Sequence, residues 1–302
     1  MRGDKLVSVV IPTFNRFDKL RRLLDSIHDS EVGDYRLEVI VVDDASTDRD
    51  YEDLHRLYGW VNVIRNDKER HLAGTRNRGI AASHGEYVFL VDDDNVLDGR
   101  CIRVLADAMQ VSGTIGMAVP YMHYLSRRDT VWCGGASVSR RLFTPFIDGN
   151  VSTGRSIRHR CDAAPNAFML SRDAIDAVGL FDEANFPIHH LEADYAIRLR
   201  LAGFMATAIP EAITYHDIRY EGHFDLDIRH DKRPYNIMYG ETMLRRKWER
   251  SRFWRFAAPL IILQAMGYII VRSTKVEPKD KAHYWMMAWR GYRAGSKVRL
   301  VK

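Results

Sequence analysis

The sequence predicts an α/β fold in which a mostly parallel β-sheet carries helices on both faces. Two observations indicate this fold class. Short apolar runs rich in Val and Ile alternate with segments whose apolar residues recur at helical spacing. The alternation repeats through the first 111 residues, as expected of successive βα units. Ligands of such sheets bind beyond the carboxyl ends of the strands, so residues that follow a strand are the first functional candidates.

The first third of the chain divides cleanly into strands and helices. The run at 6–11 is β-branched and ends at Pro12, and residues 17–27 place their apolar side chains on one helical face. The same patterns predict the elements that follow, namely strands at 37–42, 61–64 and 87–91 and helices at 49–57, 74–82 and 98–111.

The middle of the chain is less regular. Residues 121–164 have poor periodicity and are predicted to form irregular strands and loops of the same domain. Regular patterns then return, with a strand at 167–170, a helix at 172–178 ended by Gly179, a helix at 194–201 ended by Gly203, and a short strand at 212–215. We therefore predict a first domain over residues 1–232 and a distinct C-terminal region over residues 233–302.

Composition excludes several classes of protein. The chain has 302 residues, of which 46% are hydrophobic and 28% charged, so it can bury a real core. Cys101, Cys133 and Cys161 are an odd number without C-x-x-C spacing, so we expect reduced, mostly buried thiols and no disulfide framework. The net charge of +5 is too small to indicate a nucleic-acid partner. The N-terminal residues lack the apolar core of a signal peptide, so we expect neither cleavage nor export.

Two acidic clusters follow predicted strands. Asp92, Asp93 and Asp94 come directly after an apolar run, and Asp43 and Asp44 end another. Clustered carboxylates repel one another, so the first cluster suits a hard divalent cation, Mg²⁺ or Mn²⁺, that bridges a diphosphate. The second cluster can accept hydrogen bonds from a base or a ribose. The alternative, that each Asp only caps the next helix, fits one cluster better than two on the same sheet.

Several short motifs occur in a fixed order. They are SVVIPTFN at 8–15, VVDDASTD at 41–48, GTRNRG at 74–79, FLVDDD at 89–94, VGLFDE at 178–183, EADYAIRLR at 192–200, AGF at 202–204 and a final His216. Each motif is weak alone, but their order and spacing over residues 5–220 are specific together. In these motifs the chain resembles the family 2 glycosyltransferases, which have the GT-A fold. The resemblance implies that residues 1–232 are a GT-A catalytic domain.

The resemblance also implies a nucleotide-sugar donor and a metal ion. Asp94 would contact the metal, Asp92 the ribose or the water shell of the metal, and His216 the metal or the diphosphate. Arg76 would pair with the diphosphate or with Asp92, and the alternative is a surface salt bridge. Its neighbour Asn77 opens the same predicted helix. The residues implied in donor binding are Pro12, Thr13, Asp43, Asp44, Arg76, Asn77, Asp92 and Asp93.

Transfer by single displacement needs a carboxylate that accepts the proton of the acceptor. Similar proteins supply it from an E-D-x-D motif ahead of a helix, and here the aligned residues are Leu191 to Asp194. Glu192 therefore stands where the catalytic Asp is usual and is the predicted base. Asp194 is the alternative base, although its position better fits a helix cap or support for the site. A third interpretation is an exposed acid at a helix N-terminus.

The C-terminal region, residues 233–302, is basic and aromatic. Residues 256–271 carry no charge, and these 16 residues would span ~24 Å as a helix, short of the ~30 Å hydrocarbon core. Extending the segment to 253–272 lengthens it towards a full span. With basic and aromatic flanks, it predicts a transmembrane or in-plane helix beside amphipathic helices, against the alternative of a buried helix or a dimer interface. We expect the cell membrane as location, with the catalytic domain on the cytoplasmic side.

The resulting hypothesis is a metal-dependent inverting glycosyltransferase. It would move a hexose from GDP-mannose or a UDP-sugar to polyprenyl or dolichyl phosphate or to a lipid-linked saccharide. One alternative is a soluble polysaccharide or glycoprotein transferase, and another is a non-catalytic sugar-nucleotide-binding membrane scaffold. The presence of Asp92, Asp94, Glu192 and His216 together argues against the scaffold. A dinucleotide dehydrogenase is excluded because no G-x-G-x-x-G follows the first strand.

Overall fold

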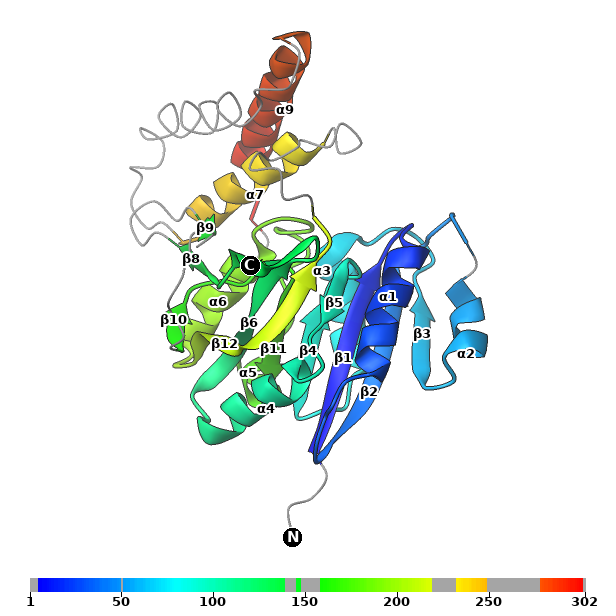
Figure 1. Ribbon diagram of the computed structural model, residues 1–302. Helices are drawn as coiled ribbons and strands as arrows, with labels where there is room; N and C mark the ends of the chain where they lie inside the picture. The colour runs from blue at the N-terminus through cyan, green and yellow to red at the C-terminus, as the bar shows by residue number, and fades with distance from the viewer. Residues whose placement is uncertain are drawn as a thin grey trace.

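The computed structural model describes residues 5–49, 51–138, 145–147, 158–218, 232–248 and 278–300. They form a mixed α/β fold, in which helices cover both faces of a ten-stranded sheet and two C-terminal helices lie beyond one edge of it (Figure 1). The strands lie in the order β10-β12-β6-β11-β4-β1-β2-β3, with β5 added to β12 and β7 to β6.

The first half of the sheet is parallel, as the sequence predicts. β1 pairs in parallel with β2 and β4, and β2 pairs in parallel with β3. The predicted short helix at 49–57 is a 3-10 turn, η1 (Tyr51–Asp53), followed by α2 (Leu54–Leu57). The other elements of this half are β1 (Lys5–Thr13), α1 (Phe17–His28), β2 (Tyr35–Asp43), β3 (Val61–Arg65), α3 (His71–Ala82) and β4 (Tyr87–Val91).

The second half of the sheet corrects the expectation of a mostly parallel arrangement. β11 (Ala167–Ser171) runs antiparallel to both of its neighbours, β4 and β6 (Ile115–Tyr124). β12 (Met205–His216) is parallel to β6 and antiparallel to β5 (Asn95–Leu97) and β10 (His159–Cys161). The periodicity of a strand reveals its buried face but not its direction, so the sequence could not reveal this reversal.

Residues 121–164, which are predicted to form irregular strands and loops, contain several short strands. β7 (Arg127–Cys133) pairs with the end of β6, and β8 (Ala136–Val138) pairs with β9 (Pro145–Ile147) in a separate two-stranded sheet. The remaining helices of this half are α4 (Cys101–Val111), α5 (Arg172–Val178) and α6 (Leu191–Leu201). Helix α6 begins three residues earlier than predicted because His190, with a φ of 67°, reverses the chain just before it.

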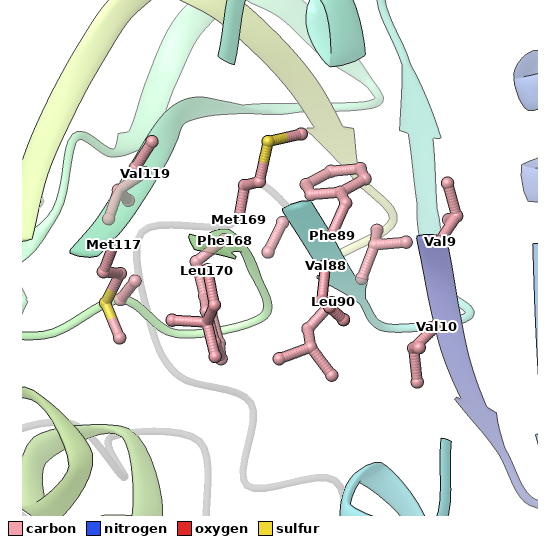
Figure 2. Close-up of a cluster of buried hydrophobic side chains, with 14 of the residues drawn as sticks. Val9, Val10, Val88, Phe89, Leu90, Met117, Val119, Phe168, Met169 and Leu170 are labelled. Atoms are coloured by element: carbon pink, nitrogen blue, oxygen red, sulfur yellow. The ribbon is translucent and has the colours of Figure 1, made fainter. Parts of the chain in front are cut away.

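The core lies where β1, β4, β6 and β11 meet the helices. Figure 2 shows part of it, with side chains of Val9, Phe89, Met117 and Phe168, all fully buried. Each such side chain stabilises the fold by about 1.5–3 kcal/mol. All three cysteines are free and buried, which confirms the prediction made for them.

Helix α3 approaches the sheet closely. A side chain at Gly79 would collide with Val10 of β1 and with Val42 of β2, so the helix needs glycine at this contact. Because the helix lies so close to the sheet at Gly79, the preceding turn of α3 is also close to the sheet. That turn carries Arg76, whose side chain is fully buried.

The two C-terminal helices, α7 (Arg233–Trp248) and α9 (Pro278–Lys297), pack on each other, and α7 also packs against α6. A Cβ at Gly240 of α7 would lie 2.8 Å from the carbonyl oxygen of His189, so the backbones are in close contact. In the described part of the chain, no helix is both long and apolar enough to cross a membrane. The predicted hydrophobic segment at 253–272 lies outside the described residues.

Candidate active site

The carboxyl ends of the strands gather the predicted site residues at one edge of the sheet. The parallel register sets Thr13 of β1 beside Asp43 of β2. Ala167 of β11 lies opposite Val91, so the antiparallel strand also starts at this edge. The described residues other than glycine that adopt a left-handed backbone, with φ between 52° and 72°, are Asn15, Ala45, His71, Asn166 and His190, which all adjoin these strand and helix ends. Such unfavourable conformations concentrate at functional sites.

Arg76 connects two of the predicted functional carboxylates. Its Nη1 donates to Oε1 of Glu192 at 2.6 Å, and its Nη2 donates to Oδ1 of Asp92 at 2.7 Å. The guanidinium lies 5.4 Å from the ring centroid of Phe168 and is shielded from solvent. The pairing with Asp92 is one of those left open by the sequence, and the surface salt bridge was the wrong alternative.

Burial affects the two partners of this pair in opposite directions. It favours the neutral form of Arg76, but the charges of Asp92 and Glu192 outweigh it and hold the pKa of Arg76 above its ordinary value. Burial raises the pKa of Glu192, and the attraction of Arg76 offsets only part of that rise. Glu192 is therefore a stronger proton acceptor than an exposed carboxylate.

The other two acids of the first cluster, Asp93 and Asp94, both pair with the guanidinium of Arg16. Nη1 of Arg16 lies 3.1 Å from Oδ1 of Asp93 and 3.0 Å from Oδ2 of Asp94. Thr13 also donates to Asp93, at 2.8 Å. Burial raises the pKa of Asp93 to about 7 despite these partners. Burial acts in the same direction on Asp94, but His216 and Arg16 outweigh it and hold the pKa of Asp94 well below its usual range.

His216 ends β12 beside the acidic cluster. Its Nε2 lies 3.4 Å from Oδ1 of Asp94, and its ring meets that of Trp132 edge to face at 4.6 Å between centroids. Oδ1 of Asp94 and Nδ1 of His216 are buried without a hydrogen-bond partner among the described residues. Buried polar atoms are normally satisfied, so these two are suited to an additional ligand.

The residues present fit a divalent ion only as part of a larger ligand set. Among the described residues, no group of three or more His, Cys, Asp or Glu side chains is arranged to hold a metal. Asp94 and His216 supply two donors of the types that such ions accept. A Mg²⁺ or Mn²⁺ ion at this edge would need further oxygen ligands, such as those of a diphosphate.

The second acidic cluster organises the loops around it. Asp43 accepts from the backbone N–H of Ser46 at 3.0 Å and is paired with Arg65. Asp44 accepts from the side chain of Asn66 at 2.6 Å and from the backbone N–H of Arg70 at 2.8 Å. Both acids are buried. Their partners come from the end of β3 and from the loops that follow β2 and β3, and a direct contact of either acid with a base or ribose stays a prediction.

Two other predicted residues make mainly structural contacts. The side chain of Asn77 donates to the carbonyl of Phe181 at 2.9 Å and accepts from its N–H at 2.9 Å, which ties α3 to the segment before α6. Pro12 lies within β1, opposite Val42. A direct role in donor binding stays a prediction for both.

Asp194 and Glu192 both lie in the first turn of α6, but they contact different partners. It is fully buried and accepts from Nε of Arg198 at 3.0 Å and from Nε1 of Trp248 at 2.8 Å. Nζ of Lys247 lies 2.8 Å from it. Asp194 therefore anchors α7 to α6, whereas Glu192 is held by Arg76.

Three residues that contact the site residues, Arg16, Arg65 and Trp132, are not among the candidates that the sequence predicts. Arg16 immediately follows the first motif, at the point where the chain leaves β1, so its position could have marked it as a candidate. Arg65 likewise ends β3. Trp132 carries no such signal, because its contact with His216 depends on how β7 folds back along β6.

The comparison with known families decides the assignment. The family model described as glycosyl transferase family 2 matches residues 8–179, which is more than half of the chain. The chain belongs to glycosyl transferase family 2. This membership confirms the resemblance seen in the motifs, and residues 8–179 include all three acids of the Asp92–Asp94 cluster.

Relatives of this glycosyltransferase family 2 chain include an uncharacterized protein and a named glycosyltransferase. The uncharacterized protein y4gI of Sinorhizobium fredii is 26% identical over 266 residues, which cover 84% of this chain and 28% of the relative. A dolichol-phosphate mannosyltransferase of Pyrococcus furiosus is 28% identical over 181 residues, covering 58% of this chain and 48% of the relative. The chain thus spans less than half of the length of either relative.

A solved structure supports the fold. GalNAc-T7, crystallised with UDP, GalNAc and Mn²⁺, matches with a TM-score of 0.61 at 19% identity, covering 72% of this chain and 44% of that chain. At this identity the likeness concerns the fold alone. It agrees with the mixed α/β architecture of Figure 1.

Proposed function

We propose that this chain is a metal-dependent inverting hexosyltransferase that uses a nucleotide-diphosphate sugar, GDP-mannose or a UDP-sugar. The observation that carries the proposal is the buried bridge from Asp92 through Arg76 to Glu192. It holds an acid of the Asp92–Asp94 cluster, implied in donor binding, close to a carboxylate of a different element that could serve the acceptor. Membership of the family supports the same activity.

Glu192 is the proposed general base. It would accept the proton of an acceptor hydroxyl while the hydroxyl oxygen attacks the anomeric carbon opposite the nucleotide. Its raised pKa suits this role, and Arg76 fixes its orientation. Asp194 is less suited because Arg198, Lys247 and Trp248 already occupy its oxygens.

Asp94 and His216 are the proposed protein ligands of Mg²⁺ or Mn²⁺, with Asp92 close to the water shell of the ion. The buried Oδ1 of Asp94 lies 3.4 Å from Nε2 of His216, so one ion could contact both groups, which supports this assignment. When bound, a divalent ion stabilises the negative charge of the departing diphosphate. Thr13, Asp43 and Asp44 would surround the base and ribose of the donor.

A lipid-linked acceptor at a membrane is the proposed second substrate, with the catalytic domain on the cytoplasmic side. The similarity to a dolichol-phosphate mannosyltransferase supports it. Helix α9 adds support, because Met286 and Trp289 are 42% and 47% exposed beside the exposed Arg290 and Arg293. Exposed aromatic and basic residues on one helix are typical of an interface with anionic lipids.

A donor and acceptor screen tests the proposal. UDP- and GDP-sugars would be offered with polyprenyl phosphate, with a lipid-linked saccharide and with water-soluble oligosaccharides, and nucleotide release measured for the wild type and Glu192→Gln. Transfer only to the water-soluble acceptors would favour the soluble alternative. Donor binding without turnover on any acceptor would favour the scaffold alternative.

The choice of acceptor also reports on the base. A phosphate acceptor is already negatively charged at neutral pH, whereas a hydroxyl must lose a proton. Glu192→Gln should therefore impair transfer to a saccharide hydroxyl much more than transfer to a polyprenyl phosphate. Equal losses with both acceptors would contradict the role of Glu192 as a base.

A further inference from the structure

Arg16 contacts Oδ2 of Asp94, whereas His216 lies near Oδ1 of the same carboxylate. A single nitrogen, Nη1, lies 3.1 Å from Asp93 and 3.0 Å from Asp94. The side chains of these acids are only 4% and 13% exposed, whereas the side chain of Arg16 is 39% exposed. The positive charge thus enters the cluster from the solvent side.

Hydrogen bonds hold the backbone of Arg16, whereas its side chain is partly exposed to solvent. Its N–H donates to the hydroxyl of Tyr51 at 2.9 Å, and its carbonyl accepts from the N–H groups of Lys19 and Leu20 at the start of α1. A change of side-chain rotamers alone can therefore move the guanidinium away from the acids. Asp93 would keep the hydrogen bond from Thr13, and Asp94 would keep His216 nearby.

We propose that Arg16 is a built-in counter-ion which competes with the divalent metal for Asp94 and moves onto the diphosphate when the donor binds. The proposal rests on the function proposed above, in which Asp94 holds the metal. A guanidinium at Oδ2 and a divalent cation at Oδ1 of the same carboxylate repel each other, so metal binding weakens the pairing of Arg16 with Asp94 and favours its departure. A diphosphate supplies the negative charge that the displaced guanidinium needs, because arginine matches phosphate oxygens well.

This arrangement couples metal binding to nucleotide binding. Without nucleotide, the metal either binds beside the charge of Arg16 or drives that side chain into solvent, and both weaken metal affinity. With nucleotide, the displaced side chain gains a new partner, so each ligand strengthens the binding of the other by the same factor. Arg16 would thereby limit loading of the site by the metal alone.

The test measures Mn²⁺ binding to the full chain by electron paramagnetic resonance, with and without UDP or GDP. Arg16→Gln removes the charge and keeps a polar side chain, so it should bind Mn²⁺ at least about five-fold more tightly than the wild type when nucleotide is absent. Nucleotide should then enhance Mn²⁺ affinity less in Arg16→Gln than in the wild type. Both effects are binding measurements and do not depend on turnover.

Two further variants separate the effect of the charge at position 16 from that of side-chain shape and from that of a general change in charge. Arg16→Lys keeps the charge, so its Mn²⁺ affinity without nucleotide should stay close to that of the wild type. Arg22→Gln removes a cation from helix α1, which begins directly after Arg16, and serves as the matched control for a general change in charge. Arg22 pairs with Asp217 at 2.5 Å. Arg22→Gln should change Mn²⁺ affinity less than Arg16→Gln.

The possible outcomes are distinct. Equal or weaker Mn²⁺ binding by Arg16→Gln, or equal tightening by Arg16→Lys, would overturn the role of Arg16 while leaving the proposed metal site intact. No Mn²⁺ binding by the wild type, even with nucleotide, would overturn the metal site and the role of Arg16 together. Thermal unfolding of each variant shows whether it is folded under the conditions of the assay.

Discussion

Arg76 and Glu192 form a buried ion pair, with Nη1 and Oε1 separated by 2.6 Å and Asp92 bound to the other arm of the same guanidinium. The pair joins α3 to the first turn of α6, which are 116 residues apart in the sequence. It thereby fixes the position of the proposed base relative to the Asp92–Asp94 cluster. The first two predictions concern these two residues.

Glu192→Gln retains the size of the side chain but cannot accept a proton. We expect donor binding to survive and turnover with a hydroxyl acceptor to fall by about 10²–10⁴. Steady-state kinetics with a saccharide acceptor, together with nucleotide binding by calorimetry, would measure both. The opposite pattern, with Asp194→Asn inactive and Glu192→Gln nearly wild type, would make Asp194 the base.

Arg76→Gln leaves two carboxylates near a site that has lost its cation. Breaking a buried ion pair by removing one partner costs about 3–5 kcal/mol of unfolding free energy. Arg70→Gln is the matched control, because Arg70 pairs with Glu183 through side chains that are 43% and 40% exposed. The control should lose less than about 1 kcal/mol in denaturant unfolding. Similar losses in both variants would show that the bridge has no special structural role.

Asp94→Ala removes the acid placed closest to His216. We expect transfer to be abolished and donor binding to weaken, because the diphosphate would lose its bridging cation. Activity assays before and after EDTA treatment, with Mg²⁺ or Mn²⁺ added back, would measure the dependence. Full activity of the wild type in EDTA would contradict it.

The pH dependence follows from the raised pKa of Glu192, which burial causes. The base must be deprotonated to act, so kcat/KM for a hydroxyl acceptor should fall as the pH drops through a value above 4.5, the ordinary pKa of glutamate. The pH–rate profile of the wild type would show this acidic limb. The residual activity of Glu192→Gln should lack it, and an identical limb in that variant would assign it to another group.

Trp248→Phe tests the anchoring of the C-terminal helices at Asp194. It removes the indole N–H that donates to Oδ1 of Asp194 at 2.8 Å and keeps an aromatic ring. Leaving a buried acceptor with fewer donors should cost about 1–3 kcal/mol in unfolding free energy. Trp60→Phe, on the exposed turn before β3, is a control with little expected effect. Equal stability of Trp248→Phe and the wild type would contradict the anchor.

The same contacts bear on how membrane attachment can be tested. Removing everything after residue 233 would also remove Lys247 and Trp248, which bury Asp194 two positions from the proposed base. A loss of activity in that truncation would not identify a membrane role. Vesicle sedimentation of the full chain avoids this ambiguity.

The sequence by itself determined the alternating elements, the placement of acids after strands and the family. These features are local, because hydrophobic periodicity, turn residues and motif spacing are all read over short windows. The helix bounds of α1 and α5 and the acid cluster that follows β4 agree closely with the expectations. The extra strand β5, the direction of β11 and the early start of α6 could not be predicted from such short windows.

Only the tertiary structure decided which charges meet. Arg76 lies 16 positions from Asp92 and 116 from Glu192, and Arg16 lies 77 from Asp93. No spacing rule connects such residues, because their meeting depends on strand order, on register and on how closely α3 approaches β1. Local sequence thus fixed the types of functional group, whereas packing fixed their partners. Packing also left the side chain of Arg16 partly exposed while it buried that of Arg76 completely.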